Sequence, residues 1–145
     1  MDFETGTDVM LARREGRVAV LTFNRPEARN ALHAETYEVF ERLLPELADD
    51  PDVGAVMLTG AGGAFCAGGD VKGMNARNSG EAPSPASLET AVDDLRKRQR
   101  IVSGALQTFP KVTVAAIDGA AAGAGLSIAL ACDLRVASPR AIFTT

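Results

Sequence analysis

Short runs of mainly apolar, often β-branched residues recur along the chain and predict its strands. They occupy residues 9–13, 17–23, 55–59, 112–117 and 134–137. Glu15-Gly16 separates the first two runs, and such a separation favours a β-hairpin. The runs at 55–59 and 112–117 are continuously apolar or nearly so, which is typical of buried strands.

Apolar residues at helical spacing predict helices between these strands. The first helix has one apolar face, formed by Tyr37, Phe40, Leu43, Leu44 and Leu47. Pro45 should kink or split it, because proline removes one backbone hydrogen bond. A second, longer helix has an apolar stripe formed by Leu88, Val92, Leu95, Val102 and Leu106. A third is short and apolar, over residues 126–132.

The repeated order of strand, glycine-rich turn and helix indicates an α/β fold. Residues 75–87 are rich in Asn, Ser, Gly and Pro and predict a mobile loop. A further apolar segment begins at residues 141–143, and the sequence stops at Thr145. No helix that would cover this segment follows in the sequence. We therefore interpret residues 1–145 as the N-terminal portion of a single, incomplete domain.

Composition narrows the classes of function. The net charge of −4 gives no electrostatic reason to expect nucleic-acid binding. No apolar run has the length of a membrane span, and the acidic N-terminus does not resemble a signal peptide. Cys66 and Cys132 lie in Ala-rich surroundings and indicate reduced thiols in a cytoplasmic protein. His33 is the single histidine, which excludes a multi-histidine metal site.

Two glycine-rich turns, at residues 60–70 and 119–125, each follow a predicted strand. Ligands bind at the carboxyl ends of strands in α/β folds, and residues without bulk let a ligand approach the backbone closely. The second turn also opens a helix, whose first N–H groups are free to bind an anion. Two such turns that converge would form an oxyanion hole, although each could instead be only a tight structural link.

Other glycine-loop motifs fit less well. A dinucleotide-binding fingerprint needs a third glycine where Phe65 stands, after Gly60 and Gly62. A phosphate loop of the Walker type needs a Gly-Lys-Ser/Thr sequence, which is absent. A nucleotide-binding oxidoreductase is therefore a weaker hypothesis, and NAD binding would support it.

Three linked segments resemble the enoyl-CoA hydratase/isomerase, or crotonase, superfamily. The segment from Asn24 to Leu32 is similar to the family's entry motif. Residues 56–70 resemble its first oxyanion turn, and residues 110–133 resemble its second turn with the helix that follows. The resemblance implies a spiral of ββα units that is completed by C-terminal helices, and assembly into a homotrimer or hexamer.

The resemblance also implies the site. The backbone N–H groups of Gly69 and Ala124 would form the oxyanion hole for an acyl-CoA thioester, and no separate cofactor or metal is implied. Substrate contacts would come from Arg25, Ala67, Gly68, Gly69, Asp70, Val71, Lys72 and Ala124. Lys72 could approach a coenzyme A phosphate or be a solvated lysine, and Arg25 has the same two interpretations. The basic cluster of Arg96, Lys97, Arg98 and Arg100 is interpreted as a solvated helix face rather than a coenzyme A clamp.

One position departs from the family pattern. Hydratases of this family use two glutamates, the first three residues after the second oxyanion donor, and here Ser127 stands there. Serine is no general base at neutral pH without an activating partner, so capping a helix is the alternative role. The second glutamate would lie beyond Thr145. Asp70 and Asp118 are nearby carboxylates, and both are interpreted as turn residues.

The sequence thus predicts an acyl-CoA-processing enzyme that stabilises a thioester enolate. By similarity it would be named an enoyl-CoA hydratase, whereas the absence of the first glutamate makes an isomerase chemically plausible. The alternative is a non-catalytic relative that binds acyl-CoA or serves as a scaffold.

Overall fold

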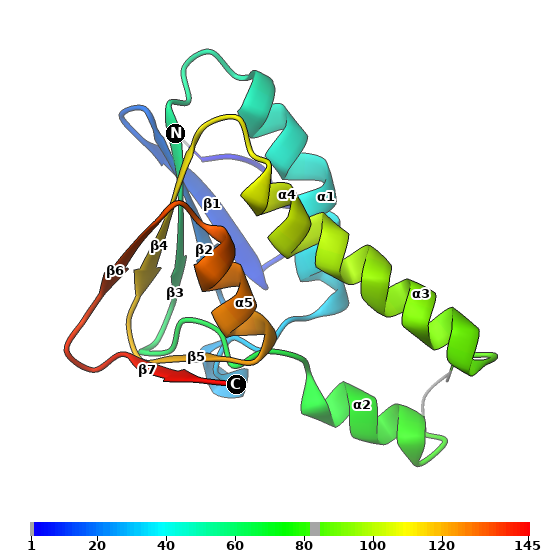
Figure 1. Ribbon diagram of the computed structural model, residues 1–145. Coiled ribbons are helices and arrows are strands. Elements are labelled where there is room, and N and C mark those ends of the chain that lie inside the picture. The colour runs from blue at the N-terminus through cyan, green and yellow to red at the C-terminus, as the bar shows by residue number, and fades with distance from the viewer. Residues whose placement is uncertain (1, 82–84) are drawn as a thin grey trace.

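A mixed sheet is the centre of the structure (Figure 1). The computed structural model describes residues 2–81 and 85–145, and its main sheet has the strand order β1-β2-β3-β4-β6. These strands are Met10–Glu15 (β1), Val18–Phe23 (β2), Ala55–Gly60 (β3), Val112–Ile117 (β4) and Leu134–Ala137 (β6). β1 and β2 form the predicted hairpin, and the remaining pairs are parallel.

Helices connect the parallel strands, as the α/β prediction requires. They are α1 (Ala34–Asp49), α2 (Val71–Asn78), α3 (Leu88–Gln99), α4 (Ala105–Gln107) and α5 (Ala124–Ala131). A π-helical turn, Arg100–Gly104, joins α3 to α4, so that the predicted second helix is one long rod. In Figure 1, α1, α4 and α5 cover one face of the sheet, while α2 and most of α3 extend away from it.

Aromatic contacts join the sheet, the first helix and the first glycine-rich turn. Phe23 of β2 lies 6.1 Å from Phe40 of α1 and 5.6 Å from Phe65, measured between ring centroids. All three rings are almost fully buried. Burying a side chain of this size stabilises a fold by about 2–3 kcal/mol. Phe65 therefore anchors the first glycine-rich turn firmly in the hydrophobic core.

In the first two predicted helices, the structure differs from two expectations. Helix α1 is not split at Pro45 but continues through it. Pro45 is exposed, whereas Leu43, Leu44 and Leu47 are buried, so the lost hydrogen bond faces solvent while core packing holds the helix. The predicted apolar stripe of the second helix is buried only at Val102 and Leu106, and Leu88 is 81% exposed because α3 extends beyond the sheet.

The predicted mobile loop at 75–87 is also partly wrong. Residues 75–78 belong to α2, and the N–H of Met74 donates to the carbonyl of Asp70 to begin that helix. The stretch from residue 71 to residue 82 contains no proline, so its Asn and Ser content did not prevent a helix at its start. Residues 82–84 of this prediction lie outside the described residues.

The last elements add a small second sheet. Strand β5 (Ala120–Ala122), inside the second glycine-rich turn, pairs in parallel with β7 (Ile142–Thr144). Side chains of β6 and β7 are exposed, including Val136 and Ile142. None of the helices within residues 2–81 and 85–145 has the length and apolar character required to cross a membrane.

Candidate active site

The first glycine-rich turn is held in place by a buried asparagine. Asn30 Nδ2 donates to the carbonyls of Ala61 and Ala64, each at 2.8 Å, and its Oδ1 accepts the backbone N–H of Arg25 at 2.8 Å. Asn30 has a left-handed φ of 57°, a conformation that asparagine tolerates better than most residues. The segment predicted as the family's entry motif is thus fastened to the turn by side-chain hydrogen bonds.

Backbone hydrogen bonds join the two glycine-rich turns directly. The N–H groups of Phe65 and Cys66 both donate to the carbonyl of Ala120 at 3.0 Å, and the N–H of Ala122 donates to the carbonyl of Cys66 at 3.0 Å. The two turns therefore converge as the sequence suggested, although the bonded residues are 54 to 56 positions apart in the sequence.

Glycine is required where the turns touch. Gly68 has φ +91°, and a Cβ there would lie 2.8 Å from the carbonyl oxygen of Ala122. A Cβ on Gly125 would lie 2.1 Å from the carbonyl oxygen of Cys66. Both distances are shorter than any tolerable contact with backbone, so bulk at either position would force the turns apart.

The two predicted donors are unoccupied by the chain itself. Within the described part of the chain, no acceptor receives a hydrogen bond from the N–H of Gly69 or of Ala124. Ala124 is the first residue of α5, whose opening N–H groups have no partner within the helix. The positive end of the helix dipole adds to the attraction of that N–H for negative charge.

Gly69 and Ala124 line one cavity of about 350 Å³. The other lining residues are Leu32, His33, Ala34, Tyr37, Asp70, Met74, Arg77, Leu95, Arg98, Gln99, Val102, Ser103 and Ile128. Its size is at the lower end of small-molecule sites, and much of its lining is apolar, as such sites are. Two free backbone donors beside one cavity could stabilise an oxyanion that develops on a bound carbonyl group.

Arg25 and Asp70 form an ion pair beside the first turn. Arg25 Nη1 lies 3.5 Å from Asp70 Oδ2 and also donates to the carbonyl of Ala31 at 2.9 Å. Asp70 lines the cavity, whereas Arg25 does not. These contacts support the interpretation of Asp70 as a residue tied to the turn.

The remaining predicted contact residues lie outside the cavity lining. Val71 and Lys72 are exposed in the first turn of α2. The N–H of Ala67 donates to the carbonyl of Arg29 at 3.0 Å, and Gly68 faces the second turn. Contact of these residues with a substrate stays a prediction.

Ser127 is exposed on α5 and does not line the cavity. Its hydroxyl lies 3.4 Å from the carbonyl of Gly123 and donates back to it, so it does not cap N–H groups as expected. His33 precedes α1 as predicted, and its N–H donates to Thr36 Oγ1 at 3.4 Å. Neither contact activates a nucleophile.

The cavity also contains residues that sequence reasoning assigned elsewhere. Tyr37 was expected on a core face, and Arg98 on a solvated one. The guanidinium carbon of Arg98 lies 5.6 Å from the centre of the Tyr37 ring, a cation–π contact. Burial raises the pKa of Tyr37 above 10.0, and Arg98 opposes that shift, so the phenol is neutral near pH 7. Helical spacing alone could not separate a core face from a cavity wall.

The two cysteine thiols are unreactive because of where they lie in the structure. Cys66 and Cys132 are free and buried, and burial raises the pKa of each thiol to about 11. A thiol with so high a pKa is protonated near neutral pH and is a poor nucleophile. Among the described residues, no group of three or more His, Cys, Asp or Glu side chains could hold a metal ion.

Asp118 has a structural role in the second turn, as predicted. It accepts hydrogen bonds from Ser138, at 2.6 Å, and from Arg140, and these bonds lower the pKa of its carboxyl. A lowered pKa in the folded state stabilises the fold above the unfolded value of about 3.8. This contribution is lost as the pH falls further and the carboxylate becomes protonated.

We therefore expect Asp118→Asn to reduce the acid dependence of stability below about pH 4. Chemical denaturation midpoints measured across the acidic range, for the wild-type protein and the variant, provide the check. Asp49→Asn, at the exposed end of α1, controls for the loss of one carboxylate. Equal acid dependence in the wild-type protein and Asp118→Asn would contradict the prediction.

Comparison with known proteins gives a consistent result. The profile of the family described as enoyl-CoA hydratase/isomerase matches residues 13–145. A probable enoyl-CoA hydratase of Mycobacterium tuberculosis is 38% identical over 138 residues, which cover 94% of this chain and 49% of that protein. A short-chain-enoyl-CoA hydratase of Clostridium acetobutylicum is 38% identical over 135 residues, covering 92% and 48%.

Solved structures agree on the fold. A crystal structure of an enoyl-CoA hydratase from Polaromonas sp. JS666 superposes with a TM-score of 0.81 at 35% identity, covering 92% of this chain and 49% of that one. An enoyl-CoA hydratase/isomerase from Xanthobacter autotrophicus Py2 gives 0.82 at 32% identity, covering 93% and 48%. This chain thus spans about half the length of the relatives it matches. With a crotonase-like fold and a profile match over most of its length, the chain belongs to the enoyl-CoA hydratase/isomerase family.

Proposed function

We propose that the protein binds an acyl-CoA thioester and stabilises the enolate formed from it. The observation that carries this proposal is the pair of free N–H groups on Gly69 and Ala124, two residues that line one cavity. As a proton leaves the carbon next to the thioester, negative charge builds up on the carbonyl oxygen. Each donor aimed at that oxygen is worth about 3–4 kcal/mol of activation free energy. Coenzyme A would be part of the substrate, and no other cofactor is required.

We further propose that the protein moves a double bond more readily than it adds water. Water addition in this family relies on two glutamates, and Ser127 stands in place of the first. Isomerisation needs one base that carries a proton between two carbons of the enolate. Asp70 is the carboxylate among the described cavity residues, and its ion pair with Arg25 ties it to the first turn.

Assays of the full-length protein separate the alternatives. We expect the double bond of a 3-enoyl-CoA to shift faster than crotonyl-CoA is hydrated, with both reactions followed by the absorbance of the conjugated thioester. Acyl-CoA binding without either reaction would favour a non-catalytic relative, which the loss of the first glutamate permits. Hydration that outpaces isomerisation would contradict the isomerase proposal but not the oxyanion hole.

Substitution of Ser127 tests its proposed lack of a chemical role. We expect Ser127→Ala to change kcat/KM by less than about twofold, because the exposed hydroxyl donates only to Gly123 and lies outside the cavity. Steady-state kinetics with the best substrate give the measurement. A loss of a hundredfold, within the range of a lost acid or base, would show that the serine takes part in proton transfer.

A further inference from the structure

Two arginines face the candidate active site from different helices. Arg77 lies on α2 and Arg98 on α3, and both line the cavity that contains Gly69 and Ala124. Both also line a second hollow between these helices, which opens next to the cavity. Within residues 2–81 and 85–145, neither guanidinium has an ion pair with a carboxylate.

Other arginines near the site are neutralised. Arg25 pairs with Asp70, and Arg96, next to the site on α3, pairs with Asp93 at 3.4 Å. Asp94 lines the second hollow but not the cavity. The charged side chains that line the cavity are therefore an aspartate already paired with Arg25 and two arginines without an acidic partner, so this part of the cavity attracts anions.

Each of the two arginines lies about one helical turn from an apolar residue of the cavity. The Cε of Met74 would be 2.5 Å from a Cβ on Gly69, so Met74 lies directly beside the first donor. Arg77 is three residues farther along α2, about one helical turn away. On the other side Val102 is buried against the core, and Arg98 precedes it by about one turn toward the exposed end of α3.

This arrangement of apolar residues and arginines suits an acyl chain with an apolar body and an anionic end. A thioester carbonyl held by Gly69 and Ala124 would place an apolar chain along Met74 and Val102, with its far end near the two guanidinium groups. Arginine binds carboxylates through paired N–H donors, and such charge-assisted bonds are about twice as strong as neutral ones. Stacking on Tyr37 holds the Arg98 guanidinium at this end of the cavity.

We propose that the acyl group ends in a carboxylate, so that the substrates are coenzyme A monothioesters of dicarboxylic acids. This inference rests on the proposed function and assigns its substrate class. The two arginines could instead bind a phosphate of coenzyme A itself. The experiment below distinguishes that phosphate from a carboxylate at the end of the acyl group.

Binding, which does not depend on turnover, is the primary measurement. Titration calorimetry on the full-length protein would compare saturated dicarboxylic monothioesters of increasing length with their terminal methyl esters. We expect the acid to bind at least about tenfold more tightly than the ester at the length that reaches the arginines. The double variant Arg77→Gln with Arg98→Gln should lose this preference.

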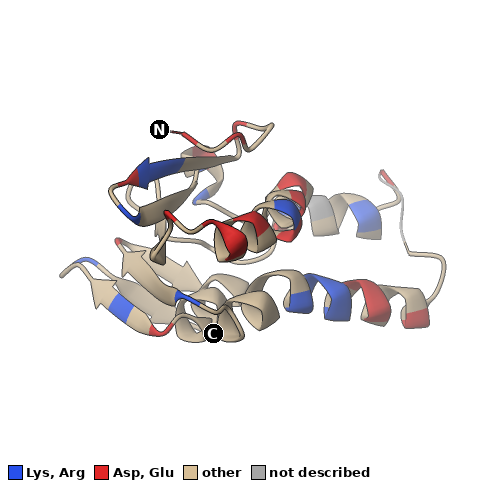
Figure 2. Cartoon of the chain, turned by 90° about the horizontal axis from the view of Figure 1, so that it is seen from above, with Lys and Arg blue, Asp and Glu red and all other residues tan. Residues whose placement is uncertain are grey.

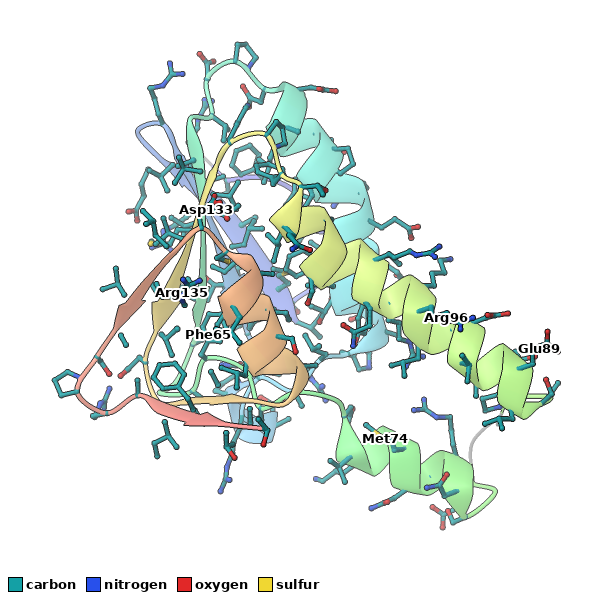
Figure 3. The ribbon with its side chains drawn as sticks, viewed as in Figure 1. Phe65, Met74, Glu89, Arg96, Asp133 and Arg135 are labelled. Carbon is teal, nitrogen blue, oxygen red and sulfur yellow. The ribbon has the colours of Figure 1, made fainter. Side chains whose placement is uncertain are left out.

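Arg96→Gln is the matched control, because Arg96 lies on the same helix (Figure 3) but lines a different hollow. It should keep the preference for the acid. Equal affinity for acid and ester at every length would overturn the proposal. So would a double variant that binds acid, ester and free coenzyme A all more weakly to the same degree, because that pattern assigns the arginines to the phosphates. If binding shows the preference but no thioester is turned over, the substrate class stands and the proposed reaction fails.

Discussion

Replacing Ala124 by proline is expected to lower kcat by about 100- to 1,000-fold while leaving the fold intact. The substitution deletes one of the two proposed oxyanion donors, and loss of one such donor has an effect of this size. Proline is tolerated at the first position of a helix, where the N–H has no partner within the helix, and Ala124 occupies that position in α5. Steady-state kinetics with the best thioester substrate would measure the loss.

Leu88→Pro provides the matched control. Leu88 is the first residue of α3, is 81% exposed, and follows Ser87, whose extended backbone suits a residue before proline. The control should keep its activity to within a few-fold, and both variants should give wild-type circular dichroism. If Ala124→Pro folds and retains wild-type kcat, the second donor has been assigned to the wrong residue.

Asn30→Ala should cause the largest loss of stability from a single side chain in this region. Asn30 is 1% exposed and makes three hydrogen bonds to backbone groups of two segments. Unpaired buried groups cost about 1–3 kcal/mol each, and a left-handed residue other than glycine or asparagine adds about 1–2 kcal/mol. The contributions are not fully additive, so we expect the free energy of unfolding to fall by about 3 kcal/mol or more.

Urea denaturation would measure this loss, with Asn24→Ala as its control. Asn24 Nδ2 makes one exposed hydrogen bond, to the carbonyl of Asp8, so its removal should cost less than about 1 kcal/mol. Because Asn30 also holds the first turn, activity should fall in the folded fraction of Asn30→Ala. A similar, small loss in both variants would mean that the turn is held by other contacts.

The charged side chains along α3 differ in their relation to the cavity. Acidic side chains lie toward the start of α3 and basic ones toward its end, as Figure 2 shows. The basic cluster at Arg96, Lys97, Arg98 and Arg100 was expected to be a solvated face. That expectation is correct for Arg96, which is exposed and paired with Asp93. Arg98 is exposed too, but it also lines the cavity, which was not expected. Their positions along α3 cannot distinguish these two arginines. Whether an arginine lines the cavity depends on where α2 and α1 lie.

Local contacts explain why some predictions from the sequence were accurate. The strands β4 and β6 match their predicted ranges because continuous apolar runs and adjacent turns define them without reference to other segments. The connection between these strands is fixed by Asp133, which accepts the N–H of Thr113 at 2.8 Å and also binds its hydroxyl (Figure 3). No local sequence pattern predicted that contact, since the two residues are twenty positions apart.

The sequence by itself determined the α/β architecture, the family and the convergence of the two glycine-rich turns. These follow from periodicity and from glycine spacing, which are properties of short segments. Only the tertiary structure decided which side chains share that cavity. Tyr37, Arg77 and Arg98 come from three helices, and their meeting depends on how those helices pack across the sheet. Packing of that kind is set by contacts between distant parts of the chain, so no single segment could reveal it.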